Sequence, residues 1–453
     1  MRRTVLKTAA AVGAVLALAA TAAWAEETLP RRAALGVQLA PAESGAQVVM
    51  ASPGLTAALA GLQAGDVITA INGAPVGSVQ EAVQLAGALR EGQRVTLSYR
   101  RGGATTEVQA TATPRPLESY AGAEAAYGAV PFQGGLLRDI LVTPATPAPG
   151  APVVFLIQGY YCATAEGSTA DHPYRALAQS LADQGIATYR VEKPGMGDSL
   201  GGPQCLQTDF DTEVAAFRAG LAHLIAAHGV APERIVLLGH SMGGVQAPLL
   251  AAETENLRGV AVMGTAMRSW HDYMIELMRV QSFFAAGVDP AQGEELSEMM
   301  RPLLDRIFNE TTPLPDIAEA NPEHAGLLTG VLQWDGEGQI LARDVSYWRQ
   351  IADQRLAAAW RDGDAPVLTM YGEADFAAID DRDHRLIVDI VNHYRPGTAT
   401  YTFLPRTGHG FGLEGTRAEA QARNAAAGGA PPPAPFNPEL GRVFGAWVLG
   451  LGD

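Results

Sequence analysis

Cysteine is scarce in this chain, and positive charge is outweighed by negative charge. Two cysteines occur in 453 residues, with no H-E-x-x-H motif and no closely spaced group of histidines and cysteines. A structural zinc site of the cysteine-rich kind is therefore not expected, and we predict no metal and no other cofactor. The formal net charge of -16 disfavours nucleic acid and anionic lipid as partners, because both would repel the chain.

An apolar run long enough for an obvious membrane span is also missing. The alanine-rich stretch 9–23 is short for a span and follows a basic start with Arg2 and Arg3. This pattern is typical of an export signal, so residues 1–25 are predicted to be removed and the mature chain to begin near Glu26. A Sec signal and a twin-arginine signal both fit the basic start. We expect a periplasmic or secreted protein without a stable membrane anchor.

The length of the chain favours two domains, because 453 residues exceed what one hydrophobic core usually serves. Residues 31–114 form a first unit of short strands and one helix, joined by a proline-containing linker, 115–125, to the rest. Strands of this unit are predicted at 35–39, 46–50, 94–100 and 105–112, and its helix at 78–89.

Four short motifs of this unit carry a resemblance to a known domain. They are Leu35-Gly36-Val37, Ala60-Gly61-Leu62, Gly65-Asp66-Val67-Ile68 and Ile71-Asn72-Gly73. The unit resembles a PDZ domain of the bacterial HtrA-protease type, which adds a peptide strand to a sheet edge and holds the terminal carboxylate with backbone amides. The resemblance implies that Leu35, Gly36 and Val37 lie at the carboxylate site. A role as a brace between domains is the alternative, because a fold does not fix a function.

Strands and helices alternate through the second unit, residues 126–453. After a hairpin at 127–132 and 136–142, strands are predicted at 153–157, 186–191, 235–238, 260–263, 367–371 and 399–403. Such alternation predicts a mostly parallel sheet with helices on both faces. Between about 268 and 356 the pattern is helical, which predicts a cap inserted over a pocket.

The most informative motif of the chain is Gly239-His240-Ser241-Met242-Gly243, directly after the apolar run 234–238. A strand that ends in G-x-S-x-G and opens into a helix holds its serine in a strained turn. The flanking glycines permit this turn, and the hydroxyl is exposed at the carboxyl edge of the sheet. Ser241 is therefore the candidate nucleophile.

Two further polar residues follow strands downstream of this serine. Asp375 comes after the strand 366–371, and His409 lies between two glycines after the last strand. The chain order of nucleophile, acid and histidine resembles the α/β-hydrolase family, as does the whole second unit. The resemblance implies that His409 takes the proton of Ser241, while Asp375 orients the imidazole and stabilises its charged form. The local rivals are Glu373, Asp380 and Asp381 for the acid, and His384 and His393 for the base.

An α/β-hydrolase also needs two amide donors for the oxyanion. The resemblance implies the backbone N–H of Met242 and one from the loop 158–161, for which Tyr160 is the first choice and Gly159 the second. Many family members carry His-Gly at this point, and Gln158 replaces that histidine here.

Cys162 and Cys205 belong to loops beside this predicted site. In an exported protein an even pair favours a disulfide over a reactive thiol, and a bridge would tie the two loops together. Two separate buried thiols are the alternative.

These features together predict an exported serine hydrolase with an α/β-hydrolase fold, preceded by a small PDZ-like α+β domain. Its substrate is predicted to be a small carboxylic ester, because no acidic or basic pocket for a peptide terminus is visible. A serine peptidase acting on peptide or aminoacyl substrates is the alternative. A second alternative is a non-catalytic PDZ protein with an inactive hydrolase scaffold, and the PDZ-like domain is a candidate binder of C-terminal peptides in each case.

Overall fold

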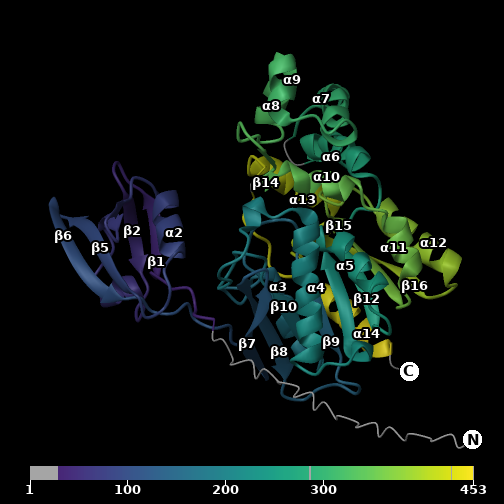
Figure 1. Ribbon diagram of the computed structural model, residues 1–453, viewed down its shortest axis with the longest axis horizontal. Coiled ribbons are helices and arrows are strands. Elements are labelled where there is room, and N and C mark those ends of the chain that lie inside the picture. The colour runs from purple at the N-terminus through teal and green to yellow at the C-terminus, as the bar shows by residue number, and fades with distance from the viewer. Residues whose placement is uncertain (1–28, 285–286, 430, 452–453) are drawn as a thin grey trace, which may run out of the picture.

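The computed structural model describes residues 29–284, 287–429 and 431–451. The expected signal and its cleavage site lie outside the described residues and stay predictions. Within the described ranges, each helix is too short or too polar to cross a lipid bilayer. Figure 1 shows a small sheet domain at one side of a larger body of sheet and helices, connected by extended segments.

The small domain is an antiparallel sheet with strand order β1-β2-β3-β5-β6, and a short β4 pairs with β3. A helix, α2, contacts the edge strand β1 (Figure 1). This helix begins one residue later than predicted because Ser78 caps it, accepting a hydrogen bond from the Glu81 amide. The elements are β1 (Val37–Pro41), β2 (Ala46–Ala51), α1 (Thr56–Leu59), β3 (Val67–Ile71), β4 (Ala74–Pro75), α2 (Val79–Gly87), β5 (Arg94–Arg101) and β6 (Ala104–Thr111).

The larger domain contains an eight-stranded sheet with the order β16-β15-β12-β11-β9-β10-β8-β7. Strands β16 to β10 in this order run parallel, whereas β8 and β7 are antiparallel, as the predicted parallel sheet with a leading hairpin requires. The first strand begins at Ala123, three residues before the predicted domain boundary. The strands are β7 (Ala123–Phe132), β8 (Gly135–Pro144), β9 (Val153–Ile157), β10 (Ala187–Val191), β11 (Ile235–His240), β12 (Gly259–Met263), β15 (Val367–Ala374) and β16 (Ala399–Gly408).

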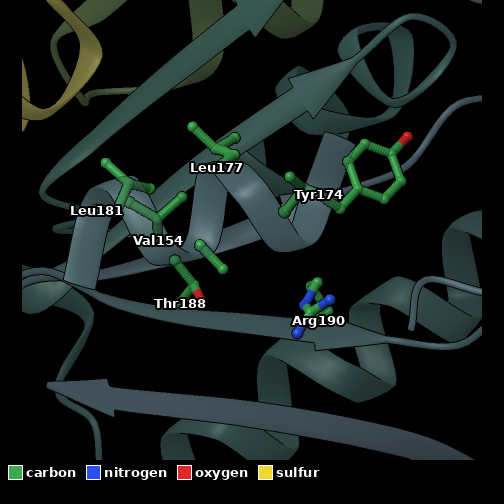
Figure 2. Close-up of a pocket in the computed structure, with 8 residues that line it drawn as sticks. Val154, Tyr174, Leu177, Leu181, Thr188 and Arg190 are labelled. Atoms are coloured by element: carbon green, nitrogen blue, oxygen red, sulfur yellow. The ribbon is translucent and has the colours of Figure 1, made fainter. Parts of the chain in front are cut away.

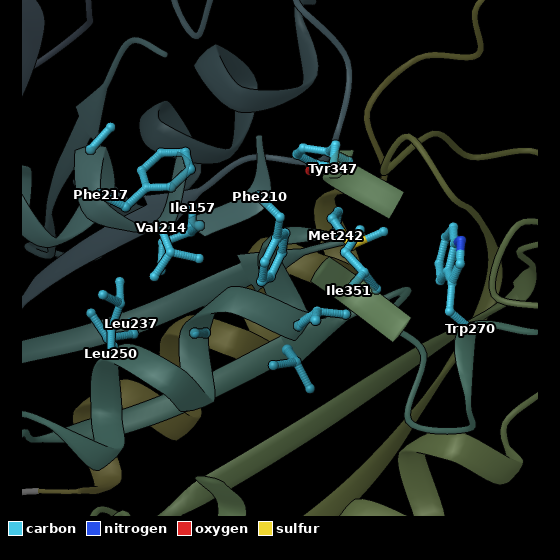
Figure 3. Close-up of a cluster of buried hydrophobic side chains, with 14 of the residues drawn as sticks. Ile157, Phe210, Val214, Phe217, Leu237, Met242, Leu250, Trp270, Tyr347 and Ile351 are labelled. Atoms are coloured by element: carbon cyan, nitrogen blue, oxygen red, sulfur yellow. The ribbon is translucent and has the colours of Figure 1, made fainter. Parts of the chain in front are cut away.

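Both faces of this sheet are buried, because alternate residues of a strand point to opposite sides. In β11, Ile235 and Leu237 pack into the larger core, while Val236 and Leu238 pack into the smaller one. Figure 3 shows the larger core, in which residues of α4 and α5 meet those of the helical insertion. The helices are α3 (Pro173–Ala182) and α14 (Pro438–Gly450) on the smaller core, α4 (Phe210–Ala226), α5 (Gly243–Ala252), α11 (Leu356–Asp362) and α12 (Arg382–Tyr394) on the larger, and α13 (Arg417–Ala426) before the C-terminal segment.

The predicted cap is an insertion between β12 and β15 at the carboxyl end of the sheet (Figure 1). Trp270, Met274 and Met300 are buried in its interior, so these apolar side chains serve mainly the core of the cap itself. Its elements are α6 (Trp270–Phe284), α7 (Pro290–Leu304), a π-helical turn (Asp305–Asn309), α8 (Leu314–Ala320), α9 (Pro322–Gly330), β13 (Gln339–Ile340), β14 (Arg343–Asp344) and α10 (Val345–Ala352).

Candidate active site

Ser241 follows β11 directly and adopts the strained conformation that its motif predicts. Its φ is 57°, in a region that residues other than glycine rarely adopt, and its amide donates to the Met263 carbonyl over 2.9 Å. A Cβ atom at Gly239 would collide with the backbone of Gly243, and one at Gly243 would collide with the Ile157 carbonyl. The two glycines are therefore needed for the close approach of strand and helix around the serine.

His409 and Asp375 form a hydrogen-bonded pair at the ends of the two neighbouring strands β16 and β15. His409 Nδ1 lies 2.9 Å from both carboxylate oxygens of Asp375, and the Ala378 amide donates to Asp375 Oδ1 over 2.8 Å. The carboxylate is fully buried. Gly264, which the sequence analysis did not single out, allows this pairing, because a Cβ there would lie 2.7 Å from Asp375 Oδ2 and 2.9 Å from His409 Nδ1.

The electrostatics of this pair favour a charged imidazole. Burial acts to lower the pKa of His409, but the charge and hydrogen bond of Asp375 outweigh it and raise that pKa above its ordinary value. Burial likewise acts to raise the pKa of Asp375, yet the neighbouring His409 leaves it lowered. An imidazolium that forms when a hydroxyl proton is taken up would therefore be stabilised at this position.

The local rivals for acid and base lie elsewhere. Glu373 accepts the Arg406 amide, whereas Asp380 and Asp381 pair with arginine side chains. His384 is buried, and burial lowers its pKa to about 4. His393 is exposed on α12.

His240 connects the end of β11, directly before Ser241, with the segment that contains His409. His240 Nε2 lies 2.8 Å from the His409 carbonyl oxygen, and its Nδ1 lies 2.9 Å from the Tyr174 hydroxyl. Burial lowers the pKa of His240 to about 3, so its ring is neutral. Among the described residues the Ser241 hydroxyl has no hydrogen-bond partner, and catalytic hydrogen bonds commonly tighten only when substrate is bound.

The two amides expected to stabilise an oxyanion are both unpartnered within the described part of the chain, namely those of Met242 and Tyr160. Tyr160 belongs to the loop 158–161 and stays the first choice for the second donor. The loop abuts the nucleophile, since a Cβ at Gly159 would lie 3.4 Å from Ser241 Oγ. Gln158 is buried and donates to the Val191 carbonyl, so it bonds within the protein.

A buried charge cluster that the sequence analysis did not predict binds the backbone carbonyls of the loop 158–161. Lys193, one of two lysines in the chain, donates to the Gly159 carbonyl and lies 3.1 Å from Glu213 Oε1. Arg343 of the cap donates to the Tyr160 carbonyl from Nε and Nη2, over 3.0 and 2.7 Å, and also pairs with Glu213. Because the Gly159 carbonyl and the Tyr160 N–H belong to one planar peptide unit, Lys193 fixes the direction of that N–H.

The expected disulfide between Cys162 and Cys205 is present, with Cα atoms 5.7 Å apart. It joins the end of the loop that contains Tyr160 to the short helical turn after β10. Arg343 Nη1 donates to the Cys205 carbonyl over 2.7 Å, so the cap contacts both tied loops.

A cleft of about 470 Å³ lies between α5 and the cap, beginning at Val245, one helical turn after the nucleophile. Trp270 and Ile351 supply apolar surface, while Arg268 and Arg355 are its charged lining residues. A separate cavity between α3, β9 and β10 holds about 10 Å³, room for at most a single water (Figure 2). That cavity is lined by apolar side chains together with Thr188 and Arg190, so we assign it no role in the reaction.

The fold and the edge geometry define an α/β-hydrolase with an N-terminal PDZ domain. Residues 33–111 match the PDZ domain family, and residues 170–411 match the family described as serine aminopeptidase, S33. The second match covers more than half of the chain, so this chain belongs to the serine aminopeptidase S33 family of α/β-hydrolases. The matched range includes Ser241, Asp375 and His409, the three residues of the predicted triad, and ends shortly after His409.

Similar solved structures include a proline iminopeptidase from Mycobacterium smegmatis, 20% identical, covering 72% of this chain and 98% of that chain with a TM-score of 0.42. Est1E from Butyrivibrio proteoclasticus with ferulic acid bound is 17% identical, covering 66% of this chain and 96% of that chain with a TM-score of 0.42. An uncharacterized Caenorhabditis elegans protein is 30% identical over 131 residues, 29% of this chain. The match spans about a quarter of that relative, 25% of its length.

Replacing Lys193 with methionine is expected to lower kcat for a p-nitrophenyl ester by about ten- to a hundredfold with little change in KM. The loss is smaller than the roughly hundred- to thousandfold cost of deleting an oxyanion donor, because the Tyr160 amide is misdirected rather than removed. Steady-state kinetics on protein with wild-type circular dichroism measures the effect. Arg218→Met, which removes an exposed cation of α4, is the control. An unchanged kcat would contradict the orienting role of Lys193.

The labelling rate of the nucleophile is expected to rise with pH through a midpoint above about 6.5, the ordinary histidine value. The sign follows because a general base must be neutral, and Asp375 raises the pKa of His409. The second-order rate constant for reaction with a fluorophosphonate is measured between about pH 5 and about pH 9, at intervals of about one pH unit. The midpoint of its rise with pH is compared with the ordinary histidine value. Asp375→Asn is expected to lower the rate about 10⁴-fold. A midpoint well below the ordinary value would argue against the pairing of His409 with an ionised Asp375.

Proposed function

We propose that this chain is an exported serine hydrolase that cleaves a carboxylic ester through an acyl-Ser241 intermediate. The proposal is supported by the His409–Asp375 hydrogen bond, by the strained turn that holds Ser241 after β11, and by two amides without a partner among the described residues. His409 takes the Ser241 proton as the hydroxyl attacks the ester carbonyl, then gives it to the leaving alcohol. The amides of Met242 and Tyr160 stabilise the oxyanion. Water then attacks the acyl carbonyl while His409 takes its proton, and His409 returns that proton to Ser241 Oγ as the carboxylic acid is released.

The lining of the cleft supports an ester over a peptide with a free N-terminus. No carboxylate is among the described residues that line it, whereas an ammonium group bound there would need a negative partner. Arg355 is exposed at the cleft and has no ion-pair partner among the described residues. Together with the apolar surface of Trp270 and Ile351, this favours an apolar acyl group or one with a distal negative charge.

A row of aromatic rings extends from the oxyanion loop into the cap and supports the same substrate class. Tyr160 packs against Trp348 at 5.3 Å between ring centroids, Trp348 stacks on Trp270 at 5.2 Å, and Trp270 stacks on Tyr273 at 4.7 Å. Tyr161 at the start of the row is 67% exposed. Trp348 and Trp270 are buried, so the partly exposed tyrosine rings of the row are the surface that would meet a planar or aliphatic acyl group.

The export part of the proposal is supported by the disulfide, because such bonds persist in oxidising compartments. N-terminal sequencing of the protein recovered from outside the cytoplasm tests this part: a mature chain that keeps residues 1–25 would contradict it.

Reaction with a fluorophosphonate probe tests the nucleophile, and a substrate panel tests the reaction. Wild type is expected to be labelled and Ser241→Ala to remain unlabelled, while Ser180→Ala, on the α3 side of the sheet, labels like wild type. Among p-nitrophenyl esters and aminoacyl or dipeptidyl anilides, we expect turnover of the esters and at least about tenfold lower kcat/KM for anilides. Faster anilide turnover would favour the peptidase alternative, and equal labelling of wild type and Ser241→Ala would overturn the nucleophile.

A C-terminal peptide is the ligand that we propose for the PDZ domain. The backbone amides of Leu35 and Gly36 have no hydrogen-bond partner in the described part of the chain, as a carboxylate-binding loop requires. Strand β1, which follows these residues, is a sheet edge with one side unpaired, and α2 lies against it. Backbone donors beside a free edge are the features by which such a domain adds a peptide strand.

Fluorescent peptides with free and amidated C-termini distinguish this ligand from a purely bracing role. Binding to the full chain is expected for the free carboxylate and to weaken about tenfold or more for the amide, since one charge-assisted contact is lost. Gly36→Val is expected to abolish binding, because Gly36 has a φ of 70° and a Cβ there would contact Leu55. Equal binding of both peptides would leave only the bracing role.

A further inference from the structure

Three metal-ligating side chains meet at the opposite end of α4 from the candidate active site. Asp139 lies on β8, His223 lies in the last turn of α4, and His228 follows that helix. Ten residues of helix separate His223 from Glu213, which is about 15 Å along the axis. The sequence analysis predicts no metal in the chain, because it finds no H-E-x-x-H motif and no closely spaced group of histidines and cysteines.

The end of the helix holds the two imidazoles in a defined arrangement. The His228 amide donates back to the His223 carbonyl over 3.3 Å, and Gly229 reverses the chain with a φ of 66°. The two rings lie 5.2 Å apart and almost perpendicular, at 82°. The turn that ends α4 therefore presents both histidines to the same point.

The donor atoms lie at distances that suit one small cation. His228 Nε2 is 2.8 Å and His223 Nε2 is 3.8 Å from Asp139 Oδ2, and one ligand atom from each of the three residues lies within 4.8 Å of the others. A tetrahedral zinc ion with bonds of about 2.0–2.1 Å keeps its ligand atoms roughly 3.3 Å apart. The two measured separations lie on either side of this value, so small side-chain movements would close the site.

One oxygen of the Asp139 carboxylate, Oδ1, has no hydrogen-bond partner among the described residues. Asp139 is fully buried, and Tyr189 donates its hydroxyl to Oδ2 over 3.1 Å. Asp139 Oδ1 is also buried and makes no hydrogen bond among the described residues. The oxygen that faces the two histidines is Oδ2, so a cation bound between them would compensate the charge of this buried carboxylate without contacting Oδ1.

We propose that Asp139, His223 and His228 bind one divalent transition-metal ion, Zn²⁺ by the chemistry of its donors. Two imidazoles and one carboxylate are a ligand set that zinc favours, with water as the fourth ligand. Tyr189 holds the carboxylate as an outer-shell partner.

The proposed ion has a structural role, because it can enter from solvent and lies between two elements of the fold away from the candidate active site. The side chains of His223 and His228 are 22% and 21% exposed, so a metal can enter from solvent. The ion would join β8, the strand next to the edge strand β7, to the end of α4. An ordinary hydrogen bond between His228 and Asp139 is the competing explanation, and it predicts no affinity for metal.

The experiment uses the full chain without a polyhistidine tag, dialysed against a chelator and titrated with Zn²⁺ by calorimetry. We expect one equivalent to bind and thermal unfolding to shift upward. The double variant His223→Ala/His228→Ala is expected to lose about a hundredfold or more in affinity, and Tyr189→Phe about ten- to a hundredfold. His393→Ala, which removes an exposed histidine of α12, is the matched control and should bind like wild type.

Cobalt provides a measurement that does not depend on the variants folding. In the wild-type chain, Co²⁺ is expected to produce the visible absorption of a tetrahedral site, and one equivalent of Zn²⁺ should remove it. Zinc binding that is undiminished in the double variant would place the metal elsewhere, for example at His409, and would overturn the proposal. Absence of saturable binding in wild type would overturn it as well.

Discussion

A single buried carboxylate, Glu213, holds the parts of the candidate site together. It lies between Lys193 and Arg343, and all three side chains are fully buried. Such charges are costly to remove from water unless every partner is in place, and here Gln246 and Tyr347 also donate to the carboxylate. The cluster therefore contributes more to the position of the loop than to overall stability, because its two cations end on consecutive carbonyls of that loop.

Much of the architecture was accessible from the sequence because it depends on local patterns. The alternation of apolar strands with helices predicts the parallel sheet, and the motif around Ser241 predicts a strained turn that the positive φ bears out. The places of Asp375 and His409 follow strand ends, and the structure brings those two together. Their catalytic roles, like that of Ser241, stay predictions.

Other parts of the site depend on contacts that leave no trace in residue spacing. Lys193 lies in a glycine-rich turn of ordinary appearance, and Arg343 lies in the cap, 183 residues from the carbonyl that it binds. The two ring nitrogens of His240 connect Tyr174 with the His409 backbone, a contact that its position in the motif does not indicate. Pairings between distant segments arise from the three-dimensional fold, so a single sequence does not indicate them.

The segments that flank the PDZ domain on both sides form ion pairs with the same residue of the hydrolase domain, Glu166. Arg31, before the domain, pairs with Glu166 and Asp198, and Arg115, after it, lies 3.7 Å from Glu166. Glu166 follows the disulfide-tied loop by a few residues, and its amide approaches Thr164 and Glu192. Bracing and peptide binding are thus compatible. The ion pairs that attach the PDZ domain come from its flanking segments, and they do not involve β1 or the loop at Gly36.

The grip of Arg343 on Tyr160 also restricts how the cap can open. If β14 moved away from the body, the Arg343 guanidinium would leave the Tyr160 carbonyl and Glu213 together. A cap that opened as one rigid lid would therefore break the contacts that position the Tyr160 loop. A cap that opens without breaking these bonds therefore keeps β14 in place as a fixed part of the site.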